Sequence, residues 1–192
     1  MNQIFLDRLY DTSPATYTAL GFSPRGSNVS HGDIKEAFLA FGVTEPWNKL
    51  SQIATAVGSS RVSLSTDYRN LARTRHSSAH NPTGNVASAD LQTNLDTAIV
   101  IGIAIDVLSL SIAQVFATAR NPSLLTVGLE NIAHNFRFID EQSDGTWVEC
   151  INGRRVKRYP DEAAAMAGAL GRSRPGRVIA RDIRRVPVAM IG

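Results

Sequence analysis

An arginine and a histidine lie close together in the segment Arg75-His76-Ser77-Ser78-Ala79-His80-Asn81. An arginine can stabilise the negative charge that develops on a phosphodiester during cleavage, and a histidine can move the proton that the reaction transfers. Arg75 and His80, with four residues between them, therefore form a candidate site for phosphodiester chemistry.

The spacing by itself is weak support, because arginine is common in this chain. With 17 arginines and four histidines, roughly one pair with four to six intervening residues is expected by accident. The sequence contains four such pairs: Arg25 with His31, Arg69 with His76, Arg73 with His80, and Arg75 with His80. Local context must therefore select among them.

The segment at 75–81 has a distinctive context. Helical spacing runs from Ser65 until Asn81-Pro82, where proline disfavours the helical region for the residue before it, so a helix should end near His80. Ser88 then caps a long apolar helix that reaches Phe116. Two shorter helices are expected upstream, from Ser30 to Gly42 and from Glu45 to Val57, with Trp47 as a core anchor in the second.

This arrangement, a polar helix end before a strongly apolar helix, resembles the HEPN superfamily and is closest to its RiboL-PSP or MAE-type branch. The likeness extends from about Ile34 to Phe116 and includes Trp47-Asn48-Lys49-Leu50 and Tyr68-Arg69-Asn70-Leu71. The resemblance implies a metal-independent, cofactor-free endoribonuclease in which two protomers pair, so that both Arg-His sets face one cleft. It also implies a toxin or antiviral defence effector, with a possible neutralising antitoxin or defence partner protein.

The same resemblance implies roles for individual residues. His80 would act as general base or acid, Arg75 would stabilise the phosphorane, and His76 or Asn81 would position the phosphate. The products would carry 2′,3′-cyclic phosphate ends. His76 stands where the family more often has asparagine or aspartate, which leaves open which histidine is the acid and which the base.

The composition changes near Asn135, and we expect a domain boundary there. Residues 1–135 would form a helical HEPN-like domain. Residues 136–192 would form a small basic α+β module, ββαβ-like, because short β-rich runs alternate with the hairpin signals Asp144-Gly145 and Asn152-Gly153. The low aromatic content, 7%, and many aliphatic residues favour a mainly α protein, a HEPN-like helical bundle with this module appended.

Positive charge is concentrated in the C-terminal module. Residues 152–192 carry ten basic and three acidic residues, against ten and fourteen in residues 1–151. Arg154, Arg155, Lys157 and Arg158 could bind RNA phosphates, or could form an ordinary solvated surface. Trp147 and Tyr159 could stack on bases or fill the core of the module. The four cations occupy both faces of one strand, which requires that strand to lie at a sheet edge.

Other classes of function are disfavoured. The single Cys150 has no neighbouring histidine, no multi-cysteine or His-containing metal spacing occurs, and no phosphate loop is present. The N-terminus does not read as a signal peptide, and Asp96 and Asp106 interrupt the apolar stretch from Leu95 to Phe116. We therefore expect a cytoplasmic protein without a membrane span.

Three alternatives remain open at this point. Arg75 and His80 could simply complement the dipole at a helix C-terminus. The chain could be a non-catalytic HEPN-like dimeric interaction or nucleic-acid-binding module, in a regulatory or immunity protein. A DNA-binding regulator would rest on the basic tail alone, because no helix-turn-helix signature is present. The preferred RNA and any activation trigger cannot be predicted from these residues.

Overall fold

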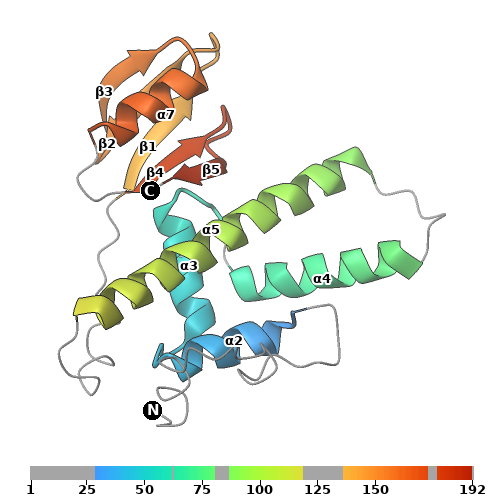
Figure 1. Ribbon diagram of the computed structural model, residues 1–192. Helices are drawn as coiled ribbons and strands as arrows, with labels where there is room; N and C mark the ends of the chain where they lie inside the picture. Colours follow the sequence, from blue (N-terminus) through green and yellow to red (C-terminus); the bar gives the residue numbers. More distant parts are fainter. Residues whose placement is uncertain (1–28, 62, 81–86, 119–135, 173–176, 192) are drawn as a thin grey trace, which may run out of the picture. The chain divides into compact units, whose positions relative to one another are not determined.

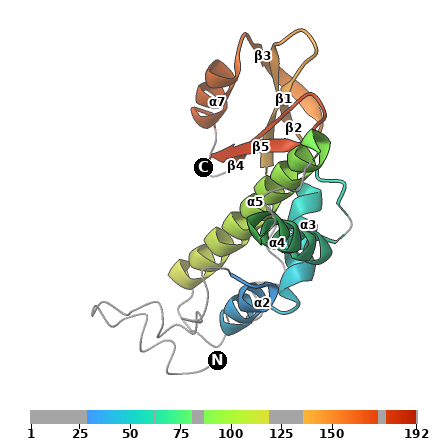
Figure 2. The ribbon, with the colours of Figure 1, turned by 90° about the vertical axis from the view of Figure 1, so that its right-hand side faces the viewer.

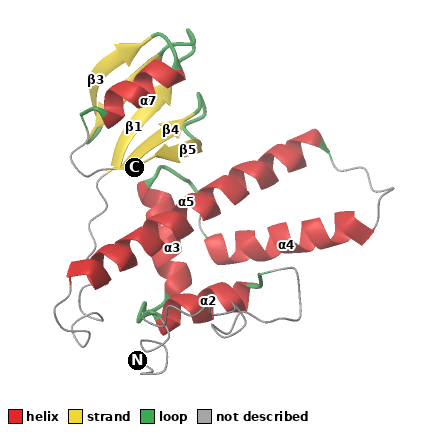
Figure 3. Ribbon diagram, viewed as in Figure 1, coloured by secondary structure: helices red, strands yellow, loops and turns green. Residues whose placement is uncertain are grey.

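A computed structural model describes residues 29–61, 63–80, 87–118, 136–172 and 177–191, with the backbone alone at residues 79, 80, 116 and 118. These residues form five helices and five strands (Figures 1 and 3). The helices are α2 (His31–Ala40), α3 (Pro46–Ala56), α4 (Leu64–His80), α5 (Ser88–Thr118) and α7 (Glu162–Leu170). The strands are β1 (Phe136–Glu141), β2 (Trp147–Ile151), β3 (Arg154–Tyr159), β4 (Arg177–Arg181) and β5 (Pro187–Ile191).

The chain divides into two compact units. One comprises Met1–Asn48 with Ser111–Ile132, and the other comprises Lys49–Leu110 with Ala133–Gly192. The boundary expected near Asn135 lies outside the described residues.

In the first unit, α2 begins with a full capping box. Ser30 Oγ accepts a hydrogen bond from the Asp33 backbone N–H at 3.1 Å, and the Asp33 carboxylate accepts one from the Ser30 N–H at 2.7 Å. Trp47 is buried, its ring stacks on His31 with centroids 4.7 Å apart, and its Nε1 donates to the His31 carbonyl. The expected core position of Trp47 is confirmed.

The second unit contains α4 and most of α5, which run in opposite directions (Figure 1). In α5 the buried side chains recur at helical spacing, with Val100, Ala104 and Val107 at 1% exposure or less. The N-terminal half of the helix is different, because Leu91 is 64% and Leu95 is 54% exposed. By length and composition the stretch Ser88–Val115 could cross a membrane, and 44% of the residues in an 18-residue apolar part of it are buried within the protein.

The strands form one mixed sheet in the order β3-β2-β1-β4-β5. β1, β2 and β3 form an antiparallel meander, and β4 then pairs parallel to β1 on the other side, after α7 has crossed the sheet. β5 closes the order with an antiparallel pair. The Asn152-Gly153 hairpin has positive φ at both residues, as a type I′ turn requires.

Helix α7 covers one face of the sheet (Figure 2). The core beneath it joins apolar side chains of the strands to small residues of the helix: Ile139, Trp147, Tyr159, Ala165, Met166, Ala169, Val178 and Ala180. Gly168 allows close approach of the helix, since a Cβ there would lie 2.5 Å from the Tyr159 hydroxyl oxygen. The hydrophobic effect across this interface holds the helix on the strands.

The prediction of a mainly α protein is wrong. The described residues form a mixed α+β fold, and the sheet has five strands rather than those of a small ββαβ-like appendage (Figure 3). Aliphatic composition cannot separate the two classes, because Ile139, Val178 and Ile179 build fully buried strands from the same residue types that build buried helices.

Candidate functional site

Residues 75–80 of the candidate segment lie at the C-terminal end of α4. The helix spans Leu64–His80, in agreement with the end expected near His80, and Arg75 and His76 are exposed in its last turns. Asn81 lies outside the described residues. The sequence between Leu64 and His80 is polar, and among its first three turns only Leu64 is fully buried.

The continuous helix separates two of the candidate residues. Successive residues of an α-helix turn by about 100°, so positions 75 and 80 lie about 140° apart around the axis. Positions 76 and 80 are four residues apart and lie on the same face, one above the other. Within one protomer, therefore, positions 76 and 80 share one face of α4, and position 75 lies on a different face.

Two further arginines share the face of His76. Positions 69, 73, 76 and 80 fall within an arc of about 60°, because their spacings of four, three and four residues follow the helical repeat. Arg69 and Arg73 are both exposed, and Arg73 Nη2 donates a 3.0 Å hydrogen bond to Asn70 Oδ1. In the sequence, both arginines also belong to Arg-His pairs of a kind expected by chance. Helical phase, rather than the count of intervening residues, is the signal that groups them.

The candidate RNA-binding cations of the C-terminal module lie on β3, which is an edge strand of the sheet. Arg154, Arg155, Lys157 and Arg158 are all exposed, on both faces of the strand. The edge position that their alternation required is confirmed. Arg158 pairs with Asp144 at 3.3 Å, whereas Arg154 and Arg155 form no ion pair within the part of the chain that the structure describes.

The two aromatic residues next to these cations belong to the core. Trp147 is 8% and Tyr159 is 6% exposed, and both pack against α7. Lys157 Nζ lies 5.1 Å from the centroid of the Tyr159 ring. Of the two roles open to these aromatic residues, filling the core is the correct one, so β3 presents positive charge without Trp147 or Tyr159 as a base-stacking surface.

Glu149 forms ion pairs with a second group of cations, beneath α7. It is fully buried on β2 and accepts hydrogen bonds from Arg137, Arg172 and the Tyr159 hydroxyl. Burial raises the pKa of Glu149, and the hydrogen bonds from its partners outweigh that effect and hold the pKa below its ordinary value.

Asp140 plays the corresponding role on the opposite face of the sheet. Its carboxylate, 1% exposed, accepts two hydrogen bonds from Arg181, at 2.7 and 3.0 Å, and pairs with Arg185. Burial raises its pKa, and both arginines together lower it below the ordinary value. Arg181 also stacks over the Phe138 ring at 4.0 Å.

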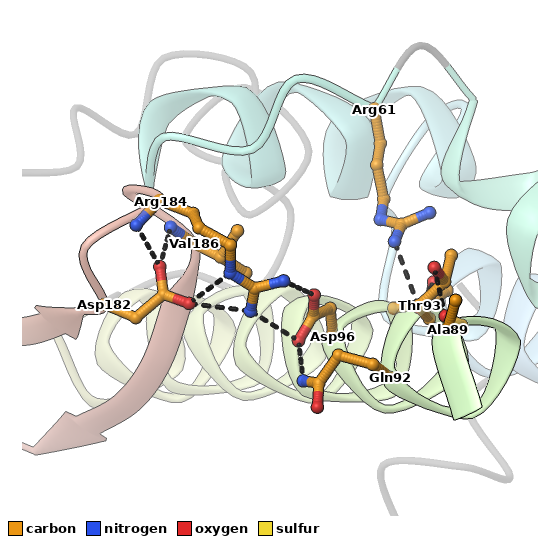
Figure 4. A network of polar contacts seen from close by, with 9 residues as sticks. Arg61, Ala89, Gln92, Thr93, Asp96, Asp182, Arg184 and Val186 are labelled. Carbon is orange, nitrogen blue, oxygen red and sulfur yellow. Dashed lines mark hydrogen bonds and ion pairs between the residues drawn. The ribbon is translucent and has the colours of Figure 1, made fainter.

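Arg184 connects the turn between β4 and β5 to α5. Its guanidinium binds Asp182 at 2.7 Å and Asp96 at 3.1 Å, and Gln92 also donates to Asp96 (Figure 4). Asp96, which interrupts the apolar stretch of α5, is therefore ion-paired and 8% exposed. Several arginines of the basic tail are thus paired with carboxylates inside the fold. The number of exposed, unpaired cations in the tail is therefore smaller than its net charge suggests.

Other chemistry has little support in the described residues. Burial, followed by the charge of Asp140, raises the pKa of the Cys150 thiol, which opposes formation of a nucleophilic thiolate. Among these residues, no group of three or more His, Cys, Asp or Glu side chains is arranged to hold a metal ion. His31 stacks on Trp47, and His134 lies outside the described residues.

The described residues thus present two exposed cationic surfaces, the end of α4 and the edge strand β3. Comparison with known proteins found no match to this chain among family models, curated proteins or solved structures.

Proposed function

We propose that the protein is a metal-independent endoribonuclease of the HEPN type, which cleaves RNA at the C-terminal end of α4. One observation carries the proposal: Arg75 and His76 are exposed in the last turns of a polar helix that ends at His80, next in the chain to the apolar α5. The resemblance of this segment to the HEPN superfamily supplies the reaction class.

The reaction requires one base, one acid and one group that stabilises negative charge. One of the two histidines takes the proton from a ribose 2′-hydroxyl, and the 2′-oxygen attacks the adjacent phosphorus. Arg75 stabilises the charge of the phosphorane, and the other histidine protonates the departing 5′-oxygen. The P–O5′ bond breaks, which leaves a 2′,3′-cyclic phosphate on one product and a 5′-hydroxyl on the other.

A pair of protomers solves the geometric problem that a single α4 presents. Because positions 75 and 80 lie about 140° apart on the helix, Arg75 of one protomer can meet a phosphate held by the histidines of a second. The exposed Leu91 and Leu95, one turn apart on α5, offer apolar surface that such a homodimer would bury. These two features support a homodimer with a shared cleft.

The test of the reaction is cleavage of a single-stranded RNA by the full chain in excess chelator. We expect cleavage, with 2′,3′-cyclic phosphate ends identified by mass spectrometry. Substitution of the RNA by its 2′-O-methyl analogue should abolish the reaction, because the nucleophile is then blocked. Loss of all cleavage in chelator, with recovery on addition of a divalent metal, would contradict the metal-independent mechanism.

The biological role and location follow the same resemblance. We propose a cytoplasmic toxin or antiviral defence effector, whose RNA cleavage would be restrained by an antitoxin or a defence partner protein. The support is the resemblance of residues 34–116 and the cationic surfaces described above.

A second candidate, a nucleic-acid-binding module without catalysis, is favoured by β3. Its cations line an exposed strand edge, and two of them form no ion pair among the described residues. Such an edge can neutralise phosphates whatever happens at α4. RNA binding by the wild-type chain, without any cleavage, is the result that would select this candidate.

A further inference from the structure

The exposed face of α4 that leads to His80 carries two arginines, Arg69 and Arg73, that the proposed cleavage reaction does not use. Arg69, Arg73 and His76 follow one another along this face at intervals of four and three residues. With a rise of 1.5 Å per residue, the row from position 69 to position 80 extends for about 16 Å. Arg75 does not belong to it.

The chemistry of this row suits a ribose-phosphate backbone. Guanidinium groups bind phosphate through paired hydrogen bonds and stay charged at all physiological pH values. The only acidic residue of α4 is Asp67, in its first turn, two positions before Arg69 and therefore about 200° away around the axis; it pairs with Arg61 at 3.6 Å. Asp67 therefore lies on a different face of α4 from Arg69 and Arg73.

The row lacks the large aromatic side chains that single-strand binding proteins use as base-stacking surfaces. No Phe, Tyr or Trp occupies positions 69, 73, 76 or 80, so the two arginines contribute mainly through contact with phosphates. The hydrogen bond from Arg73 to Asn70 holds the guanidinium of Arg73 near its own helix while the side chain remains exposed. The surface is suited to sequence-independent contact with phosphates.

We propose that Arg69 and Arg73 bind the phosphates of a single RNA strand next to the phosphate that is cleaved, and so deliver the strand to the end of α4. The inference rests on the proposed function, because it names the substrate track of the same site. Both arginines are positioning residues: they set the affinity for RNA, whereas Arg75 acts on the reacting phosphate.

The experiment measures binding and cleavage separately. Binding uses a fluorescent 2′-O-methyl oligonucleotide, which cannot be cleaved, and fluorescence anisotropy over a range of salt concentrations. The variants are Arg69→Ala with Arg73→Ala, the charge-preserving Arg69→Lys with Arg73→Lys, and Lys35→Ala as a control at an exposed lysine on α2. Circular dichroism verifies that α4 remains folded, which alanine favours.

We expect the double alanine variant to weaken binding at least fivefold and to reduce the slope of log K against log salt by roughly one to two. The double lysine variant should recover most of the affinity, and Lys35→Ala should leave it unchanged. With cleavable RNA, the alanine variant should raise KM while kcat stays within about twofold.

Two failures are distinguishable. Suppose that the wild-type chain binds the oligonucleotide, that the alanine variant loses affinity as expected, and that neither cleaves RNA. The proposed reaction is then wrong, and phosphate binding by Arg69 and Arg73 stands. If affinity and salt slope are the same in wild type and alanine variant, or if the wild-type chain does not bind the oligonucleotide, then phosphate binding by Arg69 and Arg73 is contradicted, whatever the cleavage assay shows.

Discussion

Glu149 is a buried charge of the sheet that depends on several partners. It is fully buried, yet it holds Arg137, Arg172 and the Tyr159 hydroxyl in one cluster beneath α7. A charge in such a place is tolerated because hydrogen bonds from cations replace the lost water. Removal of one member leaves the others without compensation, so the cluster stabilises the fold only when it is complete.

The lowered pKa of Glu149 predicts a specific acid sensitivity. Because its folded-state pKa is below the ordinary value of 4.5, the stabilisation is complete above that value and is lost as pH falls through the folded-state pKa. At neutral pH, Glu149→Gln should lower the free energy of unfolding by about 1–3 kcal/mol. The difference from wild type should shrink as the pH falls below 4.5.

Chemical denaturation at several pH values measures this difference. Glu36→Gln, at an exposed glutamate on α2, is the matched control and should change stability by less than about 0.5 kcal/mol. A Glu149→Gln variant as stable as wild type at neutral pH would show that the cluster does not stabilise the sheet.

For single residues such as Glu149, the sequence predicts the strand to which the residue belongs but not its burial or its partners. Its strand was predicted, because a β-rich run lies between the hairpin signals Asp144-Gly145 and Asn152-Gly153. Its burial was not, since Arg137 and Arg172 are 12 and 23 residues away along the chain. The exposure of Arg75 and His76, in contrast, is consistent with the polar composition of the helix end, which is a local property of the sequence.

At the scale of elements, two helical glycines should respond in opposite ways to the same substitution. A Cβ at Gly168 of α7 would lie 2.5 Å from the Tyr159 hydroxyl oxygen, whereas a Cβ at Gly102 of α5 would have nothing within 4 Å. Gly168→Ala should therefore destabilise the protein by about 1–3 kcal/mol through overpacking. Gly102→Ala should stabilise it by about 0.5–1 kcal/mol, because alanine favours helices.

Thermal unfolding of the two variants beside wild type is sufficient, since each serves as the control for the other. Equal shifts in the same direction would mean that the contact between α7 and Tyr159 does not limit the size of residue 168.

Local signals predicted the elements well and their arrangement only in part. The Asn152-Gly153 hairpin, the end of α4 and the start of α2 near Ser30 all depend on neighbouring residues, and the sequence contains those residues. The parallel pairing of β1 with β4 depends on contacts between residues about 40 positions apart, which no local pattern reveals. The five-stranded sheet was therefore underestimated as a small module.

At the scale of the whole molecule, the division of charge is less simple than the sequence suggests. Arg172, Arg181, Arg184 and Arg185 of the basic tail are ion-paired with carboxylates. The cations of β3 are exposed, although Arg158 among them also pairs with Asp144. Arg184 also binds Asp96 of α5. Deletion of residues 136–192 would remove that partner, so charge substitutions are the cleaner way to study the role of the sheet.

The proposed homodimer makes a prediction about Leu95. This side chain is 54% exposed and lies one turn from the still more exposed Leu91. If the two leucines pack against a second copy, Leu95→Glu should place charges in that interface and convert the dimer to a monomer, with loss of cleavage. Light scattering coupled to size exclusion measures the mass, and Lys35→Glu on α2 controls for a change in charge sign. A wild-type monomer that cleaves RNA would contradict the shared cleft.

The most direct test of the central claim is single-turnover cleavage of single-stranded RNA in chelator by wild type, Arg75→Ala, His80→Ala and the Lys35→Ala control. The account predicts that Arg75→Ala and His80→Ala each reduce the rate by about 100-fold or more, with the fold intact by circular dichroism and the control unchanged. Cleavage at the wild-type rate by both variants would contradict the assignment of the site to the end of α4.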